Sequence, residues 1–129
     1  MINLKLALTM ILLSVQPVWA ELTPVGEYNG RNYFVDSDSI KKDGNFRMVW
    51  LIANLISPGK HGELSWRNKY EYDCYEERRR ERSWSEHSGP LGQGSIIRSN
   101  ANPPSRWSPV RSDSENEVTK KVLKIVCAK

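Results

Sequence analysis

The chain has 129 residues, a hydrophobic fraction of 39% and a formal net charge of +4. This length suffices for one domain around one core, and it excludes two domains of ordinary size. The 19 basic residues are nearly balanced by 15 acidic ones, so a dedicated nucleic-acid-binding protein is not predicted and nucleic acid is not an expected partner.

Residues 1–20 have the layout of a secretory signal peptide. An apolar run follows Lys5, and the small side chains of Val18 and Ala20 precede a cleavage point. The run is shorter than the roughly 18 residues that a membrane span needs, and no membrane span is predicted in the mature chain. We therefore expect an exported protein whose single domain covers residues 21–129 and which is periplasmic, secreted or on the cell surface.

The first predicted strands are two segments rich in β-branched and aromatic residues, at 32–40 and 45–55. A turn at Asp43 and Gly44 separates them, which is typical of neighbouring antiparallel strands. Residues 48–53 are apolar on both faces, and this favours a central strand over an edge strand.

The segment after the Gly and Pro loop at 57–63 alternates in character. Trp66, Tyr70, Tyr72 and Cys74 point to one side, and charged residues point to the other. Because side chains change faces with a period of two on a strand, one face is predicted to be buried. We expect the aromatic residues of this face, together with Trp50, to form core beneath a helix.

A charged segment follows, in which four arginines stand among three glutamates between Glu76 and Arg82. The preferred interpretation is a hairpin with a turn at 75–77, whose solvated face carries cross-strand ion pairs. The alternative is a patch that binds an anionic glycan, lipid headgroup or acidic protein, because guanidinium groups pair bidentately with carboxylates and phosphates. Two tryptophans stand beside arginines in polar segments. The candidate binding residues are Lys60, Arg78, Arg79, Arg80, Arg82, Trp84 and Trp107.

The C-terminal segment contains the clearest helix signal. Apolar residues at 118, 122, 125 and 126 have helical spacing, which predicts one buried stripe. Ser112 with Glu115, and Ser114 with Glu117, each fit the capping-box pattern that starts a helix. Before it, the glycine-rich segment at 89–94 lacks phosphate-binding spacing and predicts a loop that leads into a strand at 95–99.

The two cysteines are Cys74 and Cys127. An even pair in an exported protein favours a disulfide over a reactive or metal-binding thiol pair, which would show CxxC spacing. Such a bridge would tie the helix across the tyrosine-bearing face of the sheet. The fold class predicted is α+β, a single antiparallel sheet of about six strands with a C-terminal helix packed on one face.

Two groups of residues are candidates for chemical sites. If the protein were a hydrolase, His61 and His87, with Glu86 nearby, would be its candidate acid and base pair. No nucleophile motif accompanies them, so solvated surface histidines are preferred and no enzyme is predicted. The stretch from Asp36 to Lys41 departs from a calcium loop where a ligand and a glycine are needed. No catalytic residue, metal site or cofactor is therefore predicted.

Six pieces of the chain, in order, resemble the surface-adhesin protein E family of bacterial envelope proteins: NYFVDSDSI, DGNFRMVW, YEYDC, SGPLGQG, RWSPV and the closing cysteine. The resemblance runs from about Val25 to Cys127. It implies a six-stranded antiparallel sheet whose concave side holds the C-terminal helix through a bridge between Cys74 and Cys127.

The same resemblance implies a function. It suggests an exported binding module, with a homodimer as one assembly, for host extracellular-matrix or plasma proteins, glycans or other acidic macromolecules. The alternatives are a periplasmic protein of the same fold without an adhesive role, and a small secreted hydrolase. No cysteine follows the predicted signal peptide, so no lipid-anchor site is expected.

Overall fold

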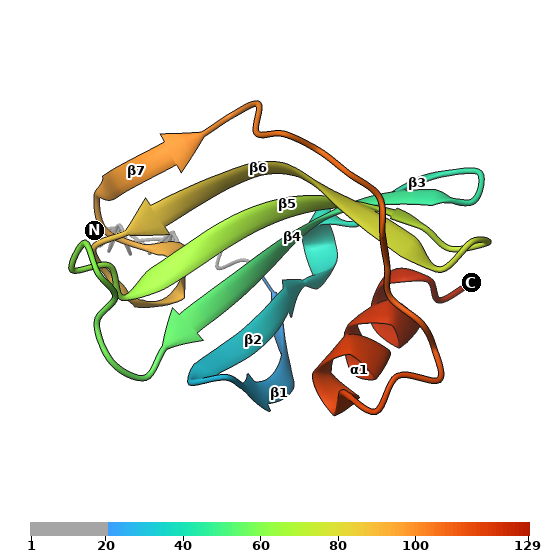
Figure 1. Cartoon of the computed structure of the whole chain (residues 1–129), viewed down its shortest axis with the longest axis horizontal. Helices are drawn as coiled ribbons and strands as arrows, with labels where there is room; N and C mark the ends of the chain where they lie inside the picture. The colour runs from blue at the N-terminus through green and yellow to red at the C-terminus, as the bar shows by residue number, and fades with distance from the viewer. Residues whose placement is uncertain (1–20) are drawn as a thin grey trace, which may run out of the picture.

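The structure, a computed structural model, describes residues 21–129. In this part of the chain, one antiparallel sheet curves around one α-helix, which lies against its concave side (Figure 1). The predicted signal peptide at 1–20 lies outside the described residues. Within residues 21–129, no helix is long and apolar enough to cross a membrane.

Six strands form the continuous sheet in the order β1-β2-β4-β5-β6-β7, and every neighbouring pair is antiparallel. Two short strands lie off this path, β3 beside β4 and β8 beside β6. The predicted sheet of about six strands is therefore confirmed, with two short additions. The bounds are Leu22–Tyr28 (β1), Arg31–Asp36 (β2), Lys41–Asp43 (β3), Phe46–Leu55 (β4), Ser65–Asp73 (β5), Arg78–His87 (β6), Ile96–Asn100 (β7) and Ser108–Pro109 (β8).

Tight turns set the register of the first hairpins. Asn29 and Gly30 join β1 to β2 with φ values of 57° and 76°, the left-handed geometry that two-residue hairpin turns require. Gly44, with φ of 56°, joins β3 to β4, where the sequence predicted a turn. Short 3₁₀ turns lie at Ser37–Ser39, between β2 and β3, and at Pro90–Gly92, between β6 and β7.

The core lies between the sheet and helix α1, which spans Glu117–Val126. Strand residues with buried side chains meet the apolar stripe of the helix, as the helical spacing predicted. This cluster contains Val25, Val35, Val49, Leu51, Tyr72, Val110, Val118, Val122, Leu123 and Val126. Ile125 is only partly buried and packs against the cluster.

Trp50 corrects one expectation, because it does not lie beneath the helix. Val49 and Leu51 are buried in the core, and the residue between them must face the opposite side of the sheet. There the guanidinium carbon of Arg67 lies 4.5 Å from the centroid of the Trp50 ring. Tyr72 does belong to the core, as predicted, and is 1% exposed.

The start of helix α1 also differs from the prediction. The side chain of Asn116 accepts hydrogen bonds from the amides of Val118 and Thr119, at 3.0 and 3.3 Å. Neither predicted capping box forms, since Ser114 Oγ instead accepts from the Asn116 amide. Asparagine is as strong an N-cap as serine, and its position two residues further along the chain fixes a later helix start.

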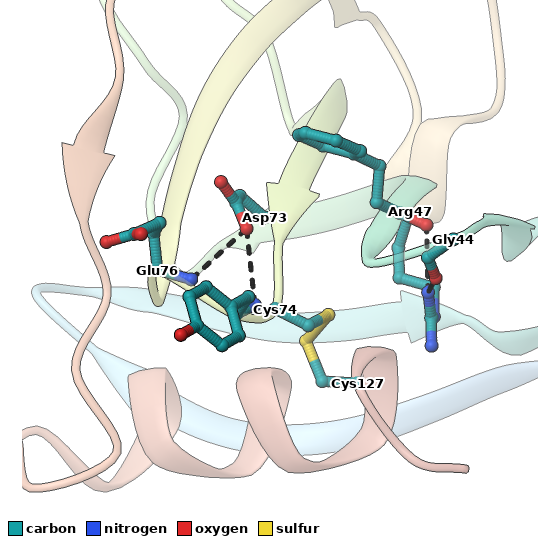
Figure 2. The surroundings of a disulfide bond; sticks show 8 residues. Gly44, Arg47, Asp73, Cys74, Glu76 and Cys127 are labelled. Atoms are coloured by element: carbon teal, nitrogen blue, oxygen red, sulfur yellow. Dashed lines mark hydrogen bonds between the residues drawn. A yellow bond between two sulfur atoms is a disulfide. The ribbon is translucent and has the colours of Figure 1, made fainter.

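The disulfide joins Cys74 to Cys127, whose Cα atoms are 5.7 Å apart (Figure 2). Cys74 directly follows β5, and Cys127 is the C-cap residue of α1. The bridge closes a sequence separation of 53 residues. In the chain-entropy model, a loop of this length stabilises the folded state by about 4 kcal/mol. The predicted pairing is confirmed, and it fixes the helix end against the turn between β5 and β6.

Candidate functional site

The predicted binding residues of β6 divide between the two faces of the sheet. In the register of β5 with β6, Arg78 and Arg80 lie opposite Asp73 and Glu71, whereas Arg79 lies opposite Tyr72. Directly opposed residues of an antiparallel pair share a face. Arg78 and Arg80 therefore lie on the face away from the helix, and Arg79 lies on the helix face.

A bulge in β6 reverses this alternation within the strand. Glu81 pairs with Tyr70 and Ser83 pairs with Lys69, so Arg82 is the extra residue between them. Beyond the bulge, Trp84 pairs with Asn68 and shares the face of Tyr70. A bulge inserts one residue and changes which side chains share a face. Trp84 is thus on the opposite face from Arg78 and Arg80.

Trp107 forms the centre of a cluster on the outer face. The guanidinium carbons of Arg78 and Arg80 each lie 4.6 Å from its ring centroid. The ring of Phe46 lies 6.1 Å away, centroid to centroid, and Phe46 is 39% exposed. Guanidinium groups at this distance from an aromatic ring are held by a cation–π attraction.

Acidic residues of β5 hold the outer arginines in place. Arg78 Nε donates to Asp73 Oδ2 at 3.1 Å, and Arg80 Nε donates to Glu71. Arg82 Nη1 lies 3.8 Å from Glu71 Oε1. Burial acts to raise the pKa of Asp73, but hydrogen bonds from the Glu76 amide and Arg78 outweigh it and lower that pKa. These contacts confirm the predicted cross-strand ion pairs.

The outer face nevertheless carries an excess of basic side chains. We call this surface the outer basic face. Lys69 Nζ lies 5.9 Å from the centroid of the Trp50 ring, next to Arg67. Basic residues thus outnumber the two acidic residues of β5 that pair with them. The outer basic face consists of Phe46, Trp50, Arg67, Lys69, Arg78, Arg80, Arg82 and Trp107.

Arg79 lies on the helix face, inside a groove that the sequence did not predict. Its guanidinium carbon is 4.1 Å from the Tyr70 ring centroid, and its Nη1 donates to the Tyr72 hydroxyl at 3.1 Å. Burial raises the pKa of Tyr70 to about 12, although the charge of Arg79 acts to lower it. The groove lies between the sheet and α1, has a volume of about 400 Å³, and its lining includes Tyr28, Arg79 and Val122.

The remaining predicted residues lie elsewhere. Trp84 packs against Trp66, with ring centroids 5.4 Å apart, and Arg98 of β7 lies over it at 5.6 Å. Lys60 is exposed in the loop between β4 and β5. The structure therefore brings together only Arg78, Arg80, Arg82 and Trp107 of the predicted set.

The two histidines do not form an acid and base pair. His87 is 4% exposed, which corrects its expected place on the surface, and its Nε2 lies 2.7 Å from Ser85 Oγ. Burial, with a smaller effect from Arg67, lowers the pKa of His87. His61 instead lies in the loop before β5, where its Nδ1 is 3.2 Å from Glu86 Oε2. Adjacent residues of β6 point to opposite faces, so the two rings are separated by the sheet.

Known proteins share this fold. The structure of crystal form II of Haemophilus influenzae protein E has a TM-score of 0.63 at 18% identity, covering 81% of this chain and 92% of that one. A second structure of that protein has a TM-score of 0.60 at 19% identity, covering 81% and 89%. Its selenomethionine form has a TM-score of 0.58 at 20% identity, covering 84% and 94%. At these identities the likeness concerns the fold alone.

A family comparison covers nearly the whole chain. The sequence model of surface-adhesin protein E matches residues 19–128, which include every strand, the helix and both cysteines. No match is found among curated proteins. The family is one of adhesins rather than enzymes. The chain belongs to the surface-adhesin protein E family.

Proposed function

We propose that this protein is an exported, non-enzymatic binding module that contacts acidic host macromolecules through the outer basic face. The observation that supports this most directly is the position of Trp107 between Arg78 and Arg80, with the exposed ring of Phe46 beside it. Tryptophan and arginine are the residue types that dominate the energetics of protein interfaces. The ligand class is host extracellular-matrix or plasma proteins and acidic glycans.

The geometry favours this face because its side chains are ordered before binding. Ion pairs to Asp73 and Glu71 fix Arg78 and Arg80 by their Nε atoms, and the other guanidinium nitrogens are left to meet a ligand. Side chains that are already ordered lose less conformational entropy on association. Membership of an adhesin family supports binding in general, but a shared fold does not define a ligand.

A binding assay with the disulfide-bonded domain, residues 21–129, tests the proposal. The domain is passed over immobilised heparin, as an acidic probe, and over a panel of purified matrix and plasma proteins. The double variant Arg78→Gln with Arg80→Gln is expected to bind at least about tenfold more weakly. Binding of the unchanged domain is expected to fall as ionic strength rises.

The matched control is Lys121→Gln with Lys124→Gln, which removes the same charge from exposed positions of α1. This control is expected to retain binding, because the helix lies on the other face of the sheet. Equal losses in both variants would mean that net charge, rather than the outer basic face, drives the association. Thermal unfolding of each variant verifies that the fold is unchanged.

The rival function is a periplasmic protein of the same fold with no adhesive role. Labelling of intact cells with a reagent that cannot cross the outer membrane distinguishes the two, since a surface adhesin is labelled and a periplasmic protein is not. Light scattering of the purified domain tests the homodimer that the family resemblance suggested. A dimer that forms only when the outer basic face is intact would place the partner copy on that face.

A further inference from the structure

His61, Glu63 and Glu86 form a cluster of metal-ligating side chains that lies apart from the outer basic face. We propose that these three residues bind one divalent transition-metal ion, with Zn²⁺ as the best fit. One donor atom from each lies within 4.8 Å of the others. His61 and Glu63 come from the loop between β4 and β5, and Glu86 comes from β6.

The loop backbone is folded in a way that brings its two donors together. The Gly59 amide donates to the Glu63 carbonyl at 2.9 Å, and the Gly62 amide donates to the Gly59 carbonyl at 3.0 Å. Gly62 has a φ of 77°, a left-handed conformation that favours glycine. The His61 amide donates to Glu63 Oε2 at 2.9 Å, which orients the carboxylate toward the imidazole.

Gly59 leaves the space that the Glu63 carboxylate fills. A Cβ atom built on Gly59 would lie 1.7 Å from Glu63 Oε1, so a larger residue would force the carboxylate out of the cluster. Glycine at positions 59 and 62 thus allows the Glu63 side chain to point into the cluster. This is a specific construction for an acidic side chain that is only 4% exposed.

The donor separations suit a small metal ion. His61 Nδ1 lies 3.2 Å from Glu86 Oε2 and 3.9 Å from Glu63 Oε2. Zinc binds imidazole nitrogen and carboxylate oxygen at about 2.0 to 2.2 Å in tetrahedral geometry, which places neighbouring ligands roughly 3.3 Å apart. Small side-chain rotations therefore close the site, and the fourth position is left for water or a ligand.

Burial of the two carboxylates also favours a bound cation. Glu86 is 1% exposed, and its Oε2 lies 3.2 Å from His61 Nδ1 but forms no hydrogen bond. A buried carboxylate oxygen without a hydrogen bond is costly. Glu63 adds a second buried carboxylate at the same place. A divalent cation would compensate both carboxylates at once.

Arg98 is a cation that lies beside the cluster. Its Nη1 lies 3.7 Å from Glu86 Oε1 and 3.0 Å from His61 Nε2. One guanidinium group does not balance two buried carboxylates, and the Arg98 side chain is 50% exposed. It can rotate toward solvent when a metal ion takes its place. Arg98 is therefore a competitor for the site rather than a ligand.

Zinc titration of the disulfide-bonded domain by calorimetry tests the site. One Zn²⁺ ion per chain is expected to bind, and His61→Ala, an exposed position in the loop, is expected to weaken binding at least about tenfold. Glu86→Gln should do the same, with circular dichroism as the check on folding. Glu81→Gln, which lies on the same strand outside the cluster, serves as the matched control and should bind zinc normally.

Arg98→Gln provides the sharpest result because the two interpretations predict opposite outcomes. If the cluster binds metal, removal of the competing cation strengthens zinc binding, and zinc raises the melting temperature of this variant more than that of the unchanged domain. If Arg98 alone neutralises the carboxylates, the variant loses stability and zinc does not restore it. Failure of the unchanged domain to bind zinc, or equal binding by the His61→Ala variant, would overturn the proposal.

Discussion

The guanidinium carbon of Arg79 lies 4.1 Å from the ring centroid of Tyr70, on the sheet face that helix α1 covers. Its Nη1 also donates to the hydroxyl of Tyr72, a residue that is 1% exposed. Arg79 is thus held by two core-facing tyrosines, while its neighbours Arg78 and Arg80 face outward. Its contacts indicate that Arg79 stabilises the fold.

Replacing Arg79 by Gln is expected to destabilise the domain by about 1 to 2 kcal/mol. The change removes the stacking on Tyr70 and leaves the Tyr72 hydroxyl without its donor. Arg79→Lys should recover only part of the loss, because lysine lacks the planar guanidinium. Urea unfolding measures the free energy. Unchanged stability together with weaker ligand binding would return Arg79 to the set of binding residues.

Alkaline solution is expected to destabilise the fold through Tyr70. Its pKa is about 12 in the folded chain, because burial raises it, and about 10 in an unfolded chain. Between these values the unfolded chain has released the proton and the folded chain has kept it. Stability is therefore complete below about pH 10 and falls as the pH rises toward 12, by about 2 to 3 kcal/mol in all.

The Tyr70→Phe variant isolates this effect. Phenylalanine has no proton to lose, so its unfolding free energy should fall less steeply between about pH 10 and 12. Titration of lysines affects both proteins alike and cancels in the comparison. Parallel pH curves for the two proteins would show that the Tyr70 hydroxyl titrates normally in the folded state.

Loss of the helix cap is expected to have a measurable cost. Asn116→Ala removes the acceptor for the amides of Val118 and Thr119, which should destabilise the domain by about 1 kcal/mol. Asn116→Asp should preserve the cap. Ser112→Ala tests the sequence-predicted start and should leave the melting temperature unchanged. The reverse order of effects in thermal unfolding would mean that the helix begins earlier than Glu117.

Reduction or removal of the disulfide should be the largest single loss. The free energy of unfolding of the double variant Cys74→Ser with Cys127→Ser is expected to be lower by about 4 kcal/mol, since the bridge closes a separation of 53 residues. Chemical denaturation under oxidising conditions gives the value. A variant as stable as the parent would mean that burial of Val122 and Val126 alone holds the helix on the sheet.

Sequence patterns predicted the parts of the fold that depend on local periodicity. The alternation from Trp66 to Cys74 and the turn at Gly44 lie where they were expected. The prediction that Trp50 lies beneath the helix was wrong, because a strand that is apolar on both faces gives no local signal of which face the helix covers. The core positions of Val49 and Leu51 place Trp50 on the opposite face of the sheet.

The candidate site was less predictable because it depends on register. Period two alone would place Arg78, Arg80 and Trp84 on one face, but the bulge at Arg82 moves Trp84 to the other. Nothing in the local sequence marks the bulge. The histidine and glutamate cluster likewise depends on contact between the loop at His61 and the far end of β6, a pairing that composition and spacing do not encode.

The position of the bridge along the chain has a consequence for biosynthesis. Cys127 follows every strand in chain order, whereas Cys74 precedes β6. During synthesis from the N-terminus, each nascent polypeptide therefore passes through a stage in which Cys74 is a lone thiol awaiting its partner. A product that stops short of residue 127 would keep that thiol reactive, so alkylation would mark truncated molecules and leave finished ones untouched.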